Sequence, residues 1–190
     1  PRWENAFAPA LCNRIDRNTG GMVIAAKSAE ALRVMNDKIR SREILKYYLC
    51  ITLGRPTPAE GTLSGYLFKD ESKKQVFVRR VPSPGAKTAI THYKTLLSRG
   101  ALSLVECELM TGRTHQIRAQ FAAAGHPLLG DGKYGRGEIN RRYGEEKQAL
   151  YSYKLTFAFR TDAGALNYLN GKTVEIKNIP FCAKYFPDYH

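Results

Sequence analysis

Hydrophobic and polar residues alternate over much of the chain, in stretches separated by glycine, proline and charged residues. Alternation with a period of two is typical of a strand that buries one face. The clearest stretch, ILKYYLCITL at residues 44–53, is rich in β-branched and aromatic residues and predicts a strand. Further strands are predicted at residues 61–68, 75–81, 88–97, 101–110 and 150–160, with weaker signals at 172–177. The apolar run MVIAAK at residues 22–27 predicts another short, buried strand.

Two segments show helical periodicity instead. Ser28 can cap a helix that runs to about Arg42, because a serine side chain accepts a hydrogen bond from a free N–H of the first turn. Thr114 can cap a second helix through about Ala124, and Gly125 suits a left-handed stop. The faces that these helices would bury carry Leu32, Met35 and Ile39 in the first, and Ile117 and Phe121 in the second.

The order of these elements indicates an α+β fold: a mixed, mainly antiparallel sheet flanked by a few helices. A doubly wound parallel sheet needs a helix between most of its strands, and this chain does not supply them. With 190 residues and no repeat, low-complexity tract or linker, the chain is expected to form a single domain over residues 1–190.

The charge of the chain is strongly basic, and this bears on its partners. There are 30 Lys and Arg against 17 Asp and Glu, which gives a formal net charge of +13. Basic side chains bind polyanions because neutralised phosphates release their counterions, and the 11 Tyr and 8 Phe offer faces on which unpaired bases can stack. RNA is therefore the favoured partner.

Other classes of protein are disfavoured. No apolar run approaches the roughly 18 residues of a membrane span, and no basic amphipathic helix stands out, so no membrane partner is expected. The cysteines lie far apart and form no C-x-x-C pair, so reduced thiols and a cytoplasmic location are the default. The histidines have no metal-binding spacing, and neither a Gly-x-Ser-x-Gly elbow nor the Pro-Cys-x-x-Cys of zinc deaminases occurs.

Four segments are candidates for chemistry. In the first, NRIDRNTGG at residues 13–21, an isolated Asp16 in a turn is more often structural than catalytic. The alternative is chemical, because Arg14 and Arg17 flank the carboxylate and favour its ionised, nucleophilic form. The second segment is Lys46-Tyr47-Tyr48, whose two phenols face opposite sides of the pleat.

The third segment, TGRTHQIR at residues 111–118, predicts a strand-to-helix turn whose free N–H groups favour an anion. It lacks the Gly-Lys-Ser/Thr of a phosphate-binding P-loop. Arg118 lies next to the apolar face of the helix and calls for a carboxylate partner, for which Asp16 is one candidate. The fourth segment, HPLLGDGKYG at residues 126–135, predicts a tight Asp-Gly loop with a structural role.

Together and in this order, the segments resemble the RluA-type family of RNA pseudouridine synthases. NRIDRNTGG is similar to the family signature His-Arg-Leu-Asp-x-x-Thr-Ser-Gly, and KYYLCITLG to its Lys-x-Tyr strand. GRTHQIR followed by HPLLGDGKYG is close to identical with the third family block. The resemblance runs from about Asn13 to Gly135.

The resemblance implies an isomerase that converts specific uridines in RNA to pseudouridine without a metal or organic cofactor. Asp16 would be the nucleophile, attacking C1′ of the ribose or C6 of the base, and Arg118 would form an ion pair with it. Tyr48 would stand against the flipped base and take part in removing the C5 proton. The residues implied to contact RNA or the base are Arg14, which would fill the gap that the base leaves, Thr19, Arg113, His115 and Ile117. Large-subunit ribosomal RNA is the favoured substrate, with tRNA next.

The chain departs from the family pattern at three places. Asn13 stands where the signature usually has His, and Gly20 where it usually has Ser. Only twelve residues precede Asn13, so the Lys-Pro-Ala-Gly-like strand and the S4-type RNA-binding domain that often precede it are expected upstream but are absent. We therefore interpret residues 1–190 as an N-terminally truncated catalytic domain.

Two alternatives stay open. An RNA-binding module without turnover would share the basic surface, and only an assay of turnover separates it from a synthase. A nucleotide-binding enzyme that uses the turn at residues 111–118 would bind free nucleotide and would not depend on Asp16.

Overall fold

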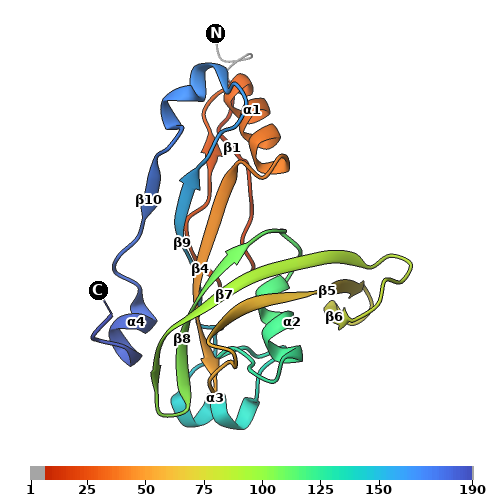
Figure 1. Ribbon diagram of the computed structural model, residues 1–190, viewed down its shortest axis with the longest axis vertical. Helices are drawn as coiled ribbons and strands as arrows, with labels where there is room; N and C mark the ends of the chain where they lie inside the picture. The colour runs from red at the N-terminus through yellow and green to blue at the C-terminus, as the bar shows by residue number, and fades with distance from the viewer. Residues whose placement is uncertain (1–6, 190) are drawn as a thin grey trace.

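The computed structural model describes residues 7–189, and a large twisted sheet forms its centre (Figure 1). Seven strands follow one another in the order β10-β9-β4-β8-β7-β5-β6, and the short β2 pairs with β9 as the eighth strand. Two more strands, β1 (Ala10–Leu11) and β3 (Ala25–Ala26), pair separately. The strands of the large sheet are β2 (Gly20–Gly21), β4 (Ile44–Leu53), β5 (Glu60–Asp70), β6 (Gln75–Arg79), β7 (Lys87–Arg99), β8 (Leu102–Leu109), β9 (Leu150–Phe157) and β10 (Thr173–Glu175).

The predicted fold class is confirmed. Within residues 7–189, all strand pairs of the large sheet are antiparallel apart from β2–β9, which is parallel. The helices are α1 (Ala29–Arg40), α2 (Gln116–Ala123), α3 (Gly137–Tyr143) and α4 (Pro180–Tyr185), with a 3₁₀ turn at Gly164–Leu169. None of the helices in this part of the chain has the length and apolarity that crossing a bilayer demands.

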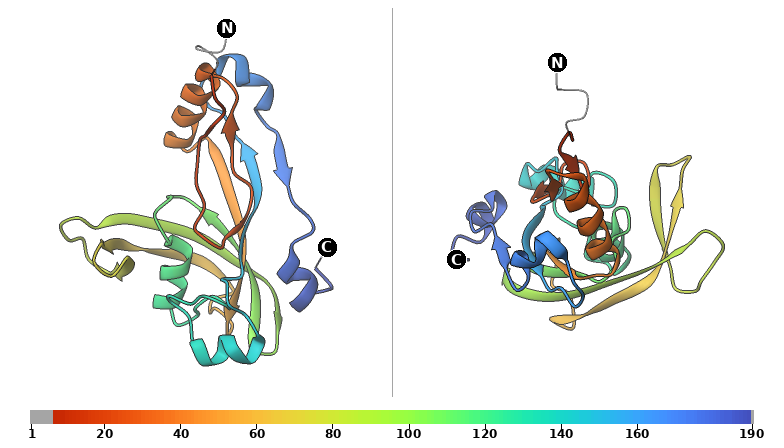
Figure 2. Two further views of the ribbon diagram at one scale, coloured as in Figure 1. Left: turned by 180° about the vertical axis from the view of Figure 1, so that it is seen from behind. Right: turned by 90° about the horizontal axis from the view of Figure 1, so that it is seen from above.

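Both faces of the central strands are covered, because neighbouring side chains of a strand point to opposite sides. On one face, Leu49 and Ile51 of β4 pack with Cys182 and Phe186 in and beside α4. On the other face, Cys50 and Tyr48 pack with Ile117 and Phe121 of α2. The two helices thus lie on opposite sides of β4 and β8, as the views from behind and from above show (Figure 2).

One part of the sheet projects from the body as an arm, formed by β5, β6 and the first half of β7 (Figure 1, yellow to green). Its exposed basic side chains are Lys69, Lys73, Lys74, Arg79, Arg80 and Lys87. Arg79 and Lys73 lie over the rings of Phe68 and Phe77, respectively. The arm therefore presents cations and aromatic rings together.

The strand predictions agree with the structure except in one place. The strand at residues 44–53 is confirmed at both ends, and the other predicted strands lie within a few residues of β5 to β10. The prediction of a buried strand at residues 22–27 is wrong, since only Ala25–Ala26 pair and the Val23 side chain is exposed. The apolar run closes a loop instead, in which the Ile24 N–H donates to the Asn13 side chain.

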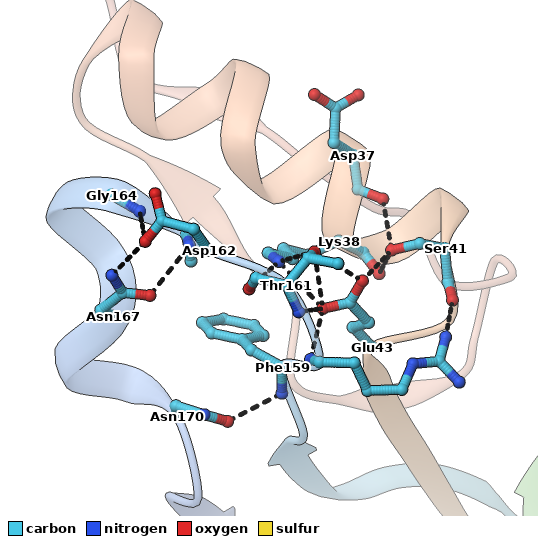
Figure 3. Close-up of polar contacts among 12 residues, drawn as sticks. Asp37, Lys38, Ser41, Glu43, Phe159, Thr161, Asp162, Gly164, Asn167 and Asn170 are labelled. Atoms are coloured by element: carbon cyan, nitrogen blue, oxygen red, sulfur yellow. Dashed lines mark hydrogen bonds and ion pairs between the residues drawn. The ribbon is translucent and has the colours of Figure 1, made fainter.

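Helix α1 begins as predicted, with the Ser28 hydroxyl oxygen accepting the Ala31 N–H at 3.2 Å. Its last turn is tied to the sheet by a buried ion pair, Lys38 Nζ to Glu43 Oε2, at 2.9 Å (Figure 3). Lys38 also donates to the carbonyl and the hydroxyl of Thr161, beyond β9. This cluster joins three segments that are distant in the sequence.

Helix α2 begins one residue later than predicted. Thr114 is not its cap: the N-cap is His115, which has a left-handed backbone (φ 53°) and makes no capping bond from its side chain. The predicted left-handed stop is confirmed, since Gly125 has φ 86°.

Candidate active site

A cleft of about 250 Å³ opens between the loop at residues 12–19, the turn at residues 111–118 and β4. Its lining includes six of the eight residues singled out in the sequence: Arg14, Asp16, Thr19, Tyr48, Arg113 and Ile117. The Asp16 carboxylate is 18% exposed, so it can be reached from the cleft. The structure thus brings together two segments that lie about a hundred residues apart.

The loop that carries Asp16 is held by hydrogen bonds at several points. The Thr19 N–H donates to the Asp16 carbonyl at 3.0 Å, which closes a turn through Asn18 (φ 67°). The buried Gln148 amide donates to the Arg17 carbonyl at 2.6 Å and to the Thr19 hydroxyl at 3.2 Å. The loop is therefore anchored although it is irregular.

Two glycines let this loop lie against β9. Gly21 has φ 109°, and a side chain there would overlap the Ser152 carbonyl of the parallel neighbouring strand. A Cβ at Gly20 would overlap the Tyr151 ring. The departures from the family signature are thus accommodated: Gly20 fits under Tyr151, and the Asn13 Oδ1 accepts the Ile24 N–H at 2.7 Å.

Tyr48 enters the cleft from β4, beside a register shift between Tyr47 and Tyr48 in the pairing with β9. Only 7% of Tyr48 is exposed. Burial, with a further contribution from the Asp16 charge, raises the pKa of the Tyr48 phenol, so it keeps its proton at neutral pH. Tyr47 lies on the other face, where the Lys154 ammonium is 4.4 Å from its ring centroid.

The turn before α2 is shaped by the side chain of the buried Gln116. Its Oε1 accepts the Thr111 hydroxyl at 2.8 Å and the Arg113 N–H at 3.0 Å, and its Nε2 donates to the Ile90 carbonyl. This internal bonding replaces the cap predicted at Thr114. It leaves Arg113 exposed at the rim of the cleft.

Arg118 contacts two carboxylates. Its Nη1 lies 3.5 Å from Asp16 Oδ2, so the two residues linked in the sequence analysis do meet. Its shorter contacts, however, are with Asp131, from Nε at 2.7 Å and from Nη2 at 3.0 Å. Asp131, assigned to a structural loop in the sequence analysis, is the main partner of Arg118.

The other predicted residues lie around this centre. Arg14 is exposed at the rim of the cleft, and Ile117 forms part of its wall with 4% exposure. His115 does not line the cleft: it lies on the Tyr134 side of Arg118, with its Nδ1 2.8 Å from the Tyr134 hydroxyl. Burial lowers the pKa of His115.

Four residues of this region were not assigned a role in the site from the sequence. Lys46 lines the cleft, and burial lowers the pKa of its ammonium. Asp131, Tyr134 and Gln148 support the site from behind the cleft. Three of these residues lie in motifs that the sequence analysis did single out: Lys46 in the Lys-x-Tyr strand, and Asp131 and Tyr134 in the Asp-Gly loop. The sequence around Gln148 carries no motif that links it to the loop of Asp16.

No group of three or more acidic, histidine or cysteine side chains within residues 7–189 could hold a metal ion. His190 lies outside the described residues.

Comparison with known proteins adds an independent line of evidence. A family profile described as RNA pseudouridylate synthase matches residues 2–123, more than half of the chain. An uncharacterized RNA pseudouridine synthase of Bacillus subtilis is 38% identical over 147 residues, covering 75% of this chain and 46% of the relative. The ribosomal large subunit pseudouridine synthase D of Borreliella burgdorferi is 31% identical over 152 residues, covering 80% of this chain and 45% of the relative.

Solved structures agree on the fold. The human RNA pseudouridylate synthase domain containing 4 aligns with a TM-score of 0.74 and 23% identity, over 96% of this chain and 76% of that chain. The human domain containing 1 aligns with a TM-score of 0.69 and 21% identity. The chain spans about half the length of the curated relatives that it matches.

Proposed function

The chain belongs to the RNA pseudouridylate synthase family, and we propose that residues 1–190 form a catalytic domain that converts uridine in RNA to pseudouridine. The observation that carries this proposal is the contact between Asp16 and Arg118 beside a cleft that also contains Tyr48. A partly exposed carboxylate next to a buried cation is suited to nucleophilic chemistry.

In the proposed reaction, Asp16 attacks C1′ of the ribose or C6 of the base. The glycosidic bond from N1 to C1′ breaks, the uracil turns, and a new bond forms from C1′ to C5. The bond to Asp16 breaks, which releases the carboxylate, and the C5 proton is lost while N1 gains one. The product is an isomer of the substrate, so the step needs no oxidant or reductant. Because these atoms are stacked inside a helix, the base must first flip out, which costs a few kcal/mol.

We propose that Tyr48 lies against the flipped base. The raised pKa of its buried phenol means that the resting group is a hydrogen-bond donor and not a phenolate. It can help to remove the C5 proton only by passing its own proton on as it accepts the new one. We propose that Arg14, which is exposed at the rim, fills the gap that the base leaves in the RNA.

The surface around the cleft favours an RNA strand as the substrate. Two further hollows, of about 310 and 190 Å³, share Gly112 and Arg113 with the cleft. Arg40, Arg42 and Lys46 line the first hollow, and Lys69 and Lys87 line the second. Cations on both sides of Arg113 can neutralise the phosphates on each side of a flipped nucleotide.

We propose ribosomal RNA as the substrate ahead of tRNA. This rests on the name of the relative from Borreliella burgdorferi, which identifies it as a ribosomal large subunit enzyme. The proposed compartment is the cytoplasm, consistent with four cysteines that are free thiols.

The proposal is tested by incubating the protein with ribosomal RNA and mapping modified sites by carbodiimide-stop primer extension. Asp16→Ala is expected to abolish every stop that the wild type produces, and Asp37→Asn, a change at an exposed surface carboxylate, is the matched control that leaves them unchanged. Identical maps for the wild type and Asp16→Ala contradict the proposal. RNA binding without any stops would favour the binding module instead.

A further inference from the structure

The guanidinium of Arg118 is divided unequally between two carboxylates. Its Nε and Nη2 form a bidentate pair with Asp131, at 2.7 and 3.0 Å. Only Nη1 is left for Asp16, at 3.5 Å, which is longer than a good charge-assisted hydrogen bond. Among the described residues, the Asp16 carboxylate has no other charged or hydrogen-bonded partner.

Asp131 is itself held rigidly and does not reach the cleft. Its side chain is fully buried, and its Oδ1 accepts the N–H groups of Lys133 at 2.8 Å and Tyr134 at 3.0 Å. Burial alone would raise the pKa of Asp131, but the bonds from Arg118 and from these N–H groups outweigh burial and lower it. Asp131 is therefore ionised at neutral pH, and its carboxylate binds one edge of the guanidinium.

Tyr134 covers the face of the same guanidinium, with the Arg118 Cζ 5.3 Å from its ring centroid. Its hydroxyl accepts the Val76 N–H at 2.9 Å and lies 2.8 Å from His115 Nδ1. Because the pKa of His115 is lowered, its imidazole is neutral at pH 7 and can accept a hydrogen bond from the Tyr134 hydroxyl. The ring is thus fixed at its outer end, between the arm and the start of α2.

We propose that Asp131 and Tyr134 are positioning residues, which orient Arg118 so that a single N–H group faces Asp16. The inference rests on the proposed function of Asp16 as the nucleophile. A carboxylate that received the bidentate pair would have hydrogen bonds on both oxygens and would be a weaker nucleophile. By taking that pair, Asp131 leaves Asp16 charged but free to attack.

The arrangement also links the site to the arm. The loop at residues 131–134 bonds to the arm twice, through Tyr134 to the Val76 N–H and through the Lys133 ammonium to the Lys74 carbonyl. A nucleic acid that binds the basic residues of the arm would therefore act, through these two hydrogen bonds, on the loop that orients Arg118.

The test is Asp131→Asn, which keeps the shape of the side chain and removes its charge. We expect Arg118 to turn toward Asp16, and the single-turnover rate at saturating RNA to fall about 100-fold, while the dissociation constant for RNA changes less than about 2-fold. Glu138→Gln, at an exposed carboxylate, is the control.

A purely structural role for Asp131 would lower the amount of folded protein without changing the rate per folded molecule at saturating RNA, and that result would overturn the proposal. A crystal structure of Asp131→Asn provides a readout that does not need turnover: bidentate contact between Arg118 and Asp16 is expected, and an unmoved guanidinium contradicts the inference. Should the wild type show no turnover that depends on Asp16, the proposed function fails, and the crystal structure still decides the positioning role.

Tyr134→Phe keeps the ring over Arg118 and removes the hydroxyl, so it serves where Asp131→Asn folds poorly. We expect a rate loss of about 5-fold at saturating RNA, from the freed ring and the unpaired Val76 N–H. A rate equal to that of the wild type would remove Tyr134 from the proposal.

Discussion

Two clusters of buried charge in this protein are built differently. At the end of α1, one cation meets one anion: Lys38 Nζ lies 2.9 Å from Glu43 Oε2, and both groups are almost inaccessible (Figure 3). Beside the cleft, one cation meets two anions, because Arg118 contacts both Asp131 and Asp16.

The clusters differ as much in hydrogen bonding as in charge. The three donors of Lys38 are all used, by Glu43 and by the carbonyl and hydroxyl of Thr161. The Glu43 oxygens also accept the Ser41 hydroxyl and the Arg160 N–H. Asp16, by contrast, has one long contact and faces the cleft. A balanced, saturated pair can only hold segments together, whereas a surplus carboxylate with free lone pairs is available for chemistry.

The largest effect is expected from Arg118→Met, which breaks the unbalanced cluster. Asp131, fully buried, would lose its main partner, at a cost of about 3–5 kcal/mol in the free energy of unfolding, and activity should be lost as well. The double variant Arg118→Met/Asp131→Leu should recover most of the stability and none of the activity. Urea unfolding and the RNA stop assay measure the two effects separately, and a stable single variant would show that the charge on Asp131 is solvated.

A smaller effect, confined to stability, is expected from Lys38→Met. Removal of the ammonium leaves the Glu43 carboxylate buried with only neutral donors, and we expect the melting temperature to fall by about 10 °C. The modification rate of the folded variant at 20 °C should stay within about 2-fold of the wild type. Arg40→Gln, in an exposed pair, is the control that should not change the melting temperature. A rate loss as large as that of Arg118→Met would remove the distinction between the clusters.

The smallest effect concerns the stability of the protein at low pH. The hydrogen bond from Lys38, together with the Arg160 N–H and the Ser41 hydroxyl, holds the pKa of Glu43 well below its ordinary value of 4.5. The stability from this shift is therefore fully present above pH 4.5 and is lost as the pH falls toward the lowered pKa. Glu43→Gln should flatten the decline in unfolding free energy below about pH 4.5, measured by urea titrations at several pH values. Parallel curves for the two proteins would mean that Glu43 titrates normally.

Several features of the fold follow from short stretches of the chain. The Ser28 cap depends on a bond to Ala31, three residues away, and the strand at residues 44–53 depends on alternation within ten residues. Such patterns are visible in the sequence because the interacting groups are near neighbours. The prediction of a strand at residues 22–27 was wrong because the hydrophobicity of this run is a local property, whereas a strand also needs a partner from elsewhere in the chain.

The site divides in the same way. Resemblance to a family drew attention to Asp16, Tyr48 and Arg118, and two of the three line one cleft with the third in contact with Asp16. The predicted cap of α2 was wrong because the side chain of Gln116, and not that of Thr114, bonds the free groups of the turn. Gln116 also donates to the Ile90 carbonyl on β7, a contact distant in the sequence.

The amino-acid sequence alone indicates the order of strands and helices, the excess of positive charge and the residues suited to nucleophilic chemistry. Only the tertiary structure decides how Arg118 is shared: it is bidentate to Asp131 and makes one longer contact with Asp16. The reason is that the strength of an ion pair between a guanidinium and a carboxylate depends on the angle of approach and on burial. Those depend on how β4, α2 and the loop at residues 131–134 pack, and no pattern of neighbouring residues encodes that packing.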